Sequence, residues 1–244
     1  MTKKVRQPPP SMVAEKHLGN AIARTQRELA AKVRAALKAL PEGTPTAQAA
    51  AIVQRTLQIE AATGGESILA VIQREGKRVL REHETLIGGS LELSATAIMA
   101  EAQATMQATN FAAQTVERVG ALKSRMISEL TASTIKAVKE GQTIGELLAA
   151  TRELAEKQGR NAKMLARNQI QNFNANVGAA RAEGAGVKKA IWRTSQDERV
   201  RESHADREGK EFELSQGLYS DIDGLYLIPG EDYNCRCVAE YIVE

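Results

Sequence analysis

Apolar residues recur at helical spacing over the first forty residues of the chain. Ser11 is a suitable N-cap for this segment, and Pro41 followed by Gly43 ends the predicted helix near Leu40. The apolar side chains share one face of the helix: Leu18, Ile22, Leu29, Val33, Leu37 and Leu40. The opposite face carries a basic stripe, which consists of Lys16, Arg24, Arg27, Arg34 and Lys38. The pattern therefore predicts an amphipathic helix.

The helical period continues through a long alanine-rich region without proline. The further helices predicted there span residues 46–63, 66–87, 91–139 and 161–182. Between the last two, Thr143 and Glu146 have the spacing of a capping box, which predicts another helix start. Gly159 lies before Asn161, so we expect a break between that helix and the last one.

Aromatic and turn-forming residues distinguish the end of the chain. Only Phe111 among the aromatic residues precedes residue 170. Strands are predicted at residues 189–194, 212–214, 225–228 and 238–243, with a charge-rich helix over 197–208. We therefore expect a mostly α protein with a small C-terminal α+β module. An elongated helical region, residues 1–159, leads into a compact mixed domain, residues 160–244.

Charge is distributed unevenly, and several classes of protein are excluded. Residues 1–40 hold nine Lys or Arg against two acidic residues, whereas residues 171–244 hold nine against fourteen. No apolar run approaches the roughly 18 residues of a membrane span, and no secretory signal is evident, so we expect no membrane association. The two cysteines are too few for a disulfide framework, which favours a reducing compartment. No phosphate-binding GxxxxGK[ST] loop is present.

The basic stripe of the first helix has two interpretations. It is a solvated face of a packed helix, or it is a surface that binds phosphates or an acidic protein through its local field. No aromatic residue lies between the basic ones, so the stripe gives no support for base stacking.

The last eighty residues contain an ordered set of unusual polar and aromatic positions. They are Arg167-Asn168-Gln169, Trp192, Asp197 to His204 with Arg199 and Arg201 between them, Gly209 with Phe212, Pro229-Gly230 and Asn234-Cys235-Arg236-Cys237. In this order they resemble the phage Mu protein F-like head morphogenesis family, over roughly residues 160–241. One departure is that the family's helix often reads Arg-Thr-Glu where this chain has Arg167-Asn168-Gln169.

The resemblance implies a minor head protein of a tailed bacteriophage. Such a protein would join the procapsid near the portal, inside the phage head, after synthesis in the host cytoplasm. Its expected partners are the portal protein and the major capsid or scaffolding protein, with no small-molecule substrate. An alternative class is a DNA-associating internal virion protein that uses the basic first helix for non-specific contacts.

The polar residues of the module allow three chemical interpretations. Asp197, His204, Cys235 and Cys237 offer four ligand types that zinc accepts, so a structural zinc site is one hypothesis and no other cofactor is expected. A metal-free polar core beneath Trp192, with the cysteines packed as small apolar residues, is the second. Besides Asp197 and His204, that core would include Arg167, Arg199, Arg201, Asn234 and Arg236. A redox pair of the two thiols is the third, although a disulfide between residues two apart would be strained.

Catalysis by the same residues receives little support from the sequence. A Cys–His nucleophile pair or a metal-dependent nuclease can be assembled from His204 and its neighbours. However, no second histidine follows at metal-ligand spacing, and His83, flanked by Glu82 and Glu84, is expected to be a solvated helix residue. We therefore expect a protein that acts by binding and not as an enzyme.

Overall fold

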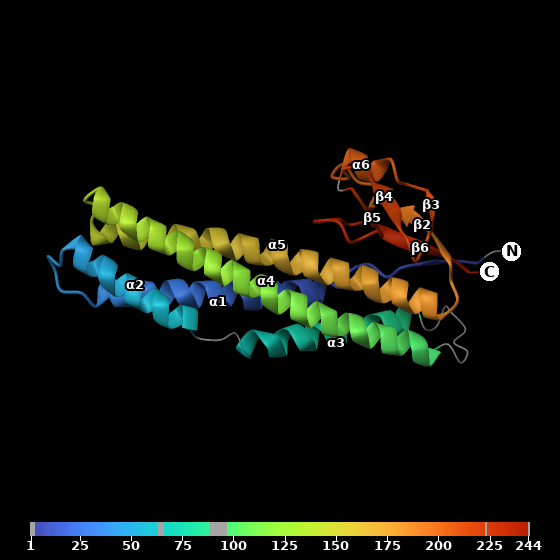
Figure 1. Ribbon diagram of the computed structural model, residues 1–244, viewed down its shortest axis with the longest axis horizontal. Coiled ribbons are helices and arrows are strands. Elements are labelled where there is room, and N and C mark those ends of the chain that lie inside the picture. Colours follow the sequence, from blue (N-terminus) through green and yellow to red (C-terminus); the bar gives the residue numbers. More distant parts are fainter. Residues whose placement is uncertain (1–2, 63–65, 88–96, 223, 244) are drawn as a thin grey trace. The chain divides into compact units, whose positions relative to one another are not determined.

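The computed structural model describes residues 3–62, 66–87, 97–222 and 224–243, which form six helices and six strands (Figure 1). The helices are α1 (Met12–Lys38), α2 (Thr46–Ala62), α3 (Glu66–Ile87), α4 (Ala97–Lys139), α5 (Ile144–Gly184) and α6 (Glu202–Ala205). The strands are β1 (Lys3–Arg6), β2 (Lys189–Arg193), β3 (Glu211–Glu213), β4 (Leu218–Ser220), β5 (Leu225–Leu227) and β6 (Val238–Val243). The predicted fold class, mostly α with a small C-terminal α+β module, is confirmed.

Two predicted helix starts have the expected caps. The hydroxyl of Ser11 accepts the Ala14 amide at 3.2 Å, which caps α1. At α5, the Thr143 hydroxyl accepts the Glu146 amide at 3.2 Å, and the Glu146 carboxylate accepts the Thr143 amide at 2.7 Å. This is the reciprocal pair of a capping box, so both predictions are confirmed.

Other predicted boundaries are corrected by the structure. The expected break near Gly159 is wrong, because α5 continues through it and buries Ala155 and Ala162 on either side. The charge-rich helix expected over residues 197–208 is reduced to the four residues of α6. Residues 91–96 of the long helix predicted from residue 91 lie outside the described residues.

The chain divides into two compact units. Unit 1 comprises residues 1–16, 72–114 and 167–244, and unit 2 comprises residues 17–71 and 115–166. The core of unit 2 is formed by side chains of α1, α2, α4 and α5, among them Leu29, Leu57, Met126 and Leu147. The expected domain boundary between residues 159 and 160 lies within α5. Independent folding of residues 160–244 stays a prediction.

Unit 1 contains an antiparallel four-stranded sheet in the order β1-β6-β2-β3 and a separate β4–β5 hairpin. Strands β1 and β4 were not predicted. In β1 only Val5 is buried, and the strand is ordered by pairing with β6, with Val5 opposite Tyr241. Trp192 and Tyr241 are fully buried in the core of this unit, together with Cys235 and Cys237.

The last part of α5 packs on α3 and α4 within unit 1. Phe173 stacks on Phe111 with ring centroids 4.5 Å apart. His83 is fully buried, and its Nε2 lies 2.7 Å from Oδ1 of Asn174. The expectation that His83 is solvated is therefore wrong, because packing against α5 removes it from water despite its two acidic neighbours.

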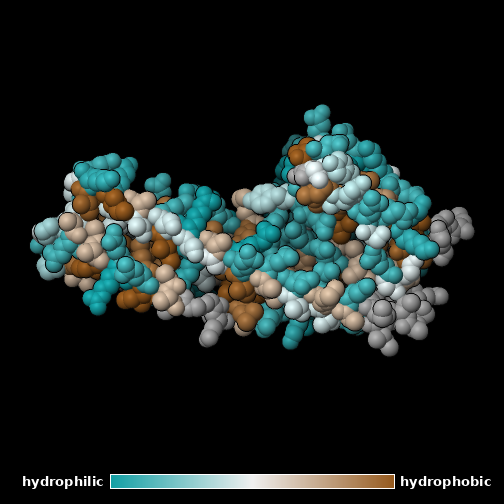
Figure 2. All heavy atoms as spheres, in the orientation of Figure 1, coloured by the Kyte–Doolittle hydropathy of each residue, from teal (hydrophilic) through white to brown (hydrophobic). Residues whose placement is uncertain are grey.

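The visible surface mixes hydrophilic residues with small groups of hydrophobic ones, over the helices and over the C-terminal strands (Figure 2). Within the described part of the chain, no helix is both long enough and apolar enough to cross a membrane.

Candidate functional site

His204, Cys235 and Cys237 come together from two short segments of unit 1. His204 lies in α6, and both cysteines precede β6. The turn that presents them closes through the Cys235 amide, which donates to the Asp232 carbonyl at 3.1 Å. Asn234 has a φ of 52°, a left-handed conformation that asparagine tolerates better than most residues. Its amide donates to Oδ1 of Asn168 on α5 at 2.8 Å, so the turn is attached to the helix.

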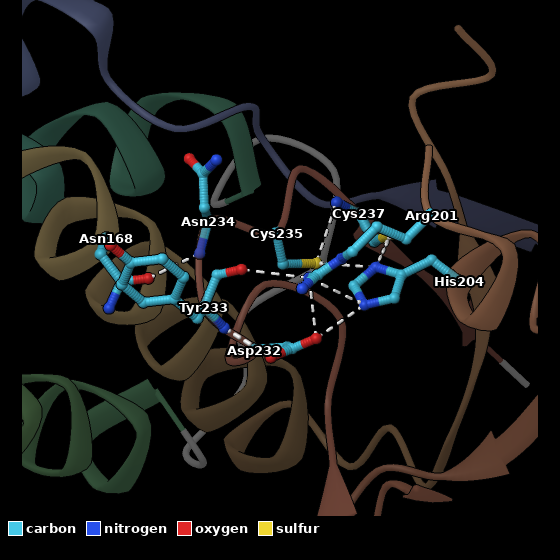
Figure 3. Close-up of polar contacts among 8 residues, drawn as sticks. All are labelled: Asn168, Arg201, His204, Asp232, Tyr233, Asn234, Cys235 and Cys237. Carbon is cyan, nitrogen blue, oxygen red and sulfur yellow. Dashed lines mark hydrogen bonds and ion pairs between the residues drawn. The ribbon is translucent and has the colours of Figure 1, made fainter. Parts of the chain in front are cut away.

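The imidazole of His204 faces both sulfurs (Figure 3). Its Nδ1 lies 3.3 Å from Sγ of Cys237 and 3.5 Å from Sγ of Cys235. The Cys235 sulfur also accepts the Cys237 amide at 3.3 Å. All three residues are buried, and their ligand atoms lie within 4.8 Å of one another. The structure thus brings together three of the four residues in the zinc hypothesis.

The other nitrogen of His204 faces a carboxylate that the sequence analysis missed. Nε2 of His204 lies 2.7 Å from Oδ2 of Asp232. Arg201 donates to the same oxygen at 2.7 Å and to the Tyr233 carbonyl at 3.0 Å. Because two donors share one oxygen, the guanidinium and Nε2 lie only 3.0 Å apart. Asp232 thus orients His204 and balances the charge of Arg201.

The side chains of His204, Cys235 and Cys237 shift one another's pKa values. A hydrogen bond from Cys237 lowers the pKa of Cys235 to about 5, and the same interaction raises the pKa of Cys237 above its usual value. The hydrogen bond with Cys235 raises the pKa of His204, although burial opposes it. One sulfur therefore carries negative charge readily, while the second keeps its proton unless another cation is present.

Asp197 lies apart from this group. Its carboxylate pairs with both terminal nitrogens of Arg236, one of them at 2.6 Å. These hydrogen bonds hold the pKa of Asp197 well below its usual range. Arg199 also contacts Asp197, at 3.4 Å, from a largely exposed side chain. The structure therefore assigns Asp197 to a surface ion pair and not to the thiol and imidazole group.

The predicted polar core is present only in part. Trp192 is fully buried and meets His204 edge to face, with ring centroids 5.9 Å apart. Arg207, which was not predicted, stacks over the Trp192 ring at 5.0 Å. Arg167 is exposed on α5 and pairs with Glu15 at 3.0 Å, so it does not belong to this core.

The structure places the five residues of the basic stripe on α1 in two different environments: two line a cavity and three do not. Within unit 2, Arg27 and Arg34 line a cavity of about 570 Å³. The other basic residues of its lining come from α5: Arg152, Arg160 and Lys163. Lys16, Arg24 and Lys38 are exposed on α1 but do not line it. Sequence reasoning missed the α5 residues because nothing in the sequence indicates which helix packs beside the stripe.

The comparison with protein families agrees with the motifs of this site. The model of the family described as "Phage Mu protein F like protein" matches residues 128–240, which include His204, Asp232 and both cysteines. This segment, a little under half of the chain, is similar to the phage Mu protein F-like family. The match relates the chain to phage head proteins and confirms the resemblance drawn from the motifs. It begins within α4, earlier than the expected module.

A curated protein is similar to half of the chain. An uncharacterized protein of Haemophilus influenzae is 34% identical over 123 residues, which are 50% of this chain and 26% of the relative. The chain therefore spans about a quarter of that relative's length. No solved structure matches the chain.

Proposed function

We propose that the protein is a minor head protein of a tailed bacteriophage that acts during head assembly by binding other head components. The observation that carries this proposal is the family match over residues 128–240. The proposed partners are the portal protein and the major capsid or scaffolding protein. The proposed location is the head interior near the portal, after assembly in the host cytoplasm.

The burial of the sulfurs supports a binding role over catalysis. In space, Cys237, His204 and Asp232 are arranged as a nucleophile, a general base and an orienting acid would be. A nucleophile must contact its substrate, yet Cys235 is 2% and Cys237 is 4% exposed. A substrate therefore has no access to either sulfur in this conformation.

The β4–β5 hairpin offers a surface for a protein partner. Four of its large apolar side chains are exposed, namely Tyr219, Ile222, Leu225 and Tyr226, and Ile222 is 77% exposed. The two tyrosine rings pack edge to face with centroids 5.2 Å apart. Exposed apolar groups of this kind favour protein contacts, and tyrosine is enriched at interfaces. We assign the proposed head contact to this hairpin.

Sedimentation with assembled heads tests the proposal. The protein is produced together with the portal, scaffolding and major capsid proteins of the same phage, and procapsids are separated on a gradient. We expect the wild type to sediment with procapsids and the Tyr226→Ser and Ile222→Ser variants to do so at least tenfold less. Ile59→Ser, which removes a 57% exposed side chain from α2, is the matched control and should behave as wild type. A wild-type protein that stays at the top of the gradient would contradict the proposal.

DNA contact through the basic cavity of unit 2 is a second candidate function. Five basic residues line this cavity with one acidic residue, Glu156, and none of the five has an ion-pair partner among the described residues. Unpaired cations around a hollow create a field that attracts phosphates. The cavity gathers basic residues from both α1 and α5, whereas the stripe predicted from the sequence lies on one helix.

Salt dependence and matched charge removal test the DNA contact. If the five cations each neutralise one phosphate, the log–log slope of affinity against salt should approach about −4.5, since each phosphate contributes about 0.9. Replacing Arg27, Arg152 and Arg160 together with glutamine should weaken binding at least tenfold. The control replaces Lys16, Arg24 and Lys38 with glutamine, which removes the same charge outside the cavity and should weaken binding less. Affinity that does not change with salt would exclude this function.

A further inference from the structure

The spacing of three buried donors matches that of a tetrahedral metal site. Zinc bonds of about 2.3 Å to sulfur and about 2.0–2.1 Å to nitrogen place those two ligand atoms roughly 3.5 Å apart. The observed distances from Nδ1 of His204 are 3.3 Å to Cys237 and 3.5 Å to Cys235. The three donors can therefore contact one ion with only small movements of their side chains.

Asp232 holds the histidine in the orientation that metal binding requires. Its carboxylate can only accept, so Nε2 of His204 carries the proton of their 2.7 Å hydrogen bond. Nδ1 then points at both sulfurs and can give its lone pair to an ion. A carboxylate on the far nitrogen of a ligating histidine is the usual arrangement at zinc sites.

The surroundings also suit an ion bound by two thiolates. Two thiolates, a neutral imidazole and a divalent cation sum to zero charge, and the nearby Asp232 and Arg201 form a neutral pair. The Cys237 amide already donates to the Cys235 sulfur. The indole N–H of Trp192, fully buried in the same core, interacts with the Cys237 side chain and favours its thiolate form.

We propose that His204 Nδ1, Cys235 Sγ and Cys237 Sγ bind one zinc ion, with Asp232 as a positioning residue. Among the described acidic, histidine and cysteine residues, these three form the group that can hold an ion, so a water molecule takes the fourth position. Two sulfurs and one imidazole favour zinc over calcium or magnesium, which prefer oxygen ligands. The proposal is independent of the head-assembly function.

The ion would connect segments that have little regular structure. His204 lies in a helix of four residues, and the cysteines lie in a turn between β5 and β6. Folding brings these donors together, so zinc binding stabilises the folded chain and releases the protons that the donors carry. Removal of the ion should therefore lower the melting temperature of the whole protein.

Metal analysis of the full chain, purified without a histidine tag and under reducing conditions, tests the proposal. We expect about one zinc per chain, a melting temperature that falls with a chelator, and recovery when zinc is returned. Cobalt exchanged into the site should give the intense sulfur-to-cobalt absorption of a tetrahedral thiolate site. A chain that contains no zinc and takes up neither zinc nor cobalt after reduction would overturn the proposal.

Five single variants separate the zinc ligands from neighbouring residues. His204→Ala and Cys235→Ser should each lose stoichiometric zinc. Asp232→Ala should weaken zinc affinity by about 10- to 100-fold, whereas Asp232→Asn, which keeps an acceptor oxygen, should be closer to wild type. Asp197→Asn, at the carboxylate first predicted as a ligand, should keep one zinc per chain. If a variant fails to fold, the cobalt spectrum of the wild type still shows whether thiolates bind the metal. Zinc that persists when both cysteines are serine would also refute the assignment.

Discussion

The surroundings of His83 select one tautomer of its neutral imidazole, with the proton on Nε2. The Asn174 amide donates to the Pro8 carbonyl at 3.0 Å, which leaves its oxygen to accept from Nε2 of His83. Nδ1 then has no proton and no hydrogen-bond partner among the described residues. Burial lowers the pKa of His83 to about 4, and the nearby positive charge of Arg181 acts in the same direction. A proton on Nδ1 would be buried without an acceptor.

This arrangement predicts how stability depends on pH. The folded-state pKa of His83 is below its unfolded value of about 6.5, so its contribution is complete above pH 6.5 and is lost as pH falls toward 4. Between pH 6 and pH 5 the wild type should lose about 1 kcal/mol more unfolding free energy than His83→Gln, because the unfolded histidine takes up a proton. Urea unfolding of both proteins at each pH measures the difference. Parallel curves would show that His83 does not titrate on unfolding.

The site illustrates what residue patterns could and could not predict. The sequence grouped His204 with Cys235 and Cys237 because thiols and imidazole are typical zinc ligands. It chose the wrong carboxylate, since both Asp197 and Asp232 were available and only the fold decides which one meets the imidazole. One signal was present: Asp232 lies three residues before Cys235, the spacing of the turn that presents the cysteine.

At the scale of elements, helices with their own caps were predicted well. The starts of α1 and α5 depend on side chains within four residues, so local sequence is sufficient. Gly159 indicated a break because glycine costs about 1 kcal/mol in a helix interior. Packing of the neighbouring Ala155 and Ala162 offsets that cost. The continuity of α5 through Gly159 therefore depends on tertiary contacts, which the sequence pattern does not reveal.

Strand β1, unlike the capped helices, could not be predicted from its local sequence. Its sequence, Lys3-Lys4-Val5-Arg6, has the charge of a solvated terminus and one apolar residue. It is a strand because β6, which lies at the other end of the chain, pairs with all four of its residues. Gln7 continues the pairing, since its amide donates to the Ala239 carbonyl at 2.8 Å. No local pattern could predict a pairing across almost the whole sequence.

At the scale of the molecule, β1 bears on the prediction that residues 160–244 fold by themselves. Unit 1 combines residues 167–244 with residues 1–16 and 72–114, which a chain cut at residue 160 would lack. Among the missing groups are the β1 strand and Gln7, whose side chain accepts the Ala239 amide at 3.1 Å. We expect the isolated fragment to fold, since it retains Trp192 and Tyr241 of the core, but to be less stable than when β1 is present.

A peptide of residues 1–11 added to the fragment of residues 160–244 tests this expectation. A ligand that binds only the folded state raises stability by RT ln(1 + [L]/Kd), so the urea midpoint should rise with peptide concentration. A Val5→Lys peptide is the matched control and should have little effect, because Val5 is the buried residue of the strand. A fragment without cooperative unfolding, with or without peptide, would show that the module requires the helical segments of unit 1. If the fragment unfolds cooperatively but its urea midpoint does not change with peptide concentration, β1 contributes no stability to the sheet.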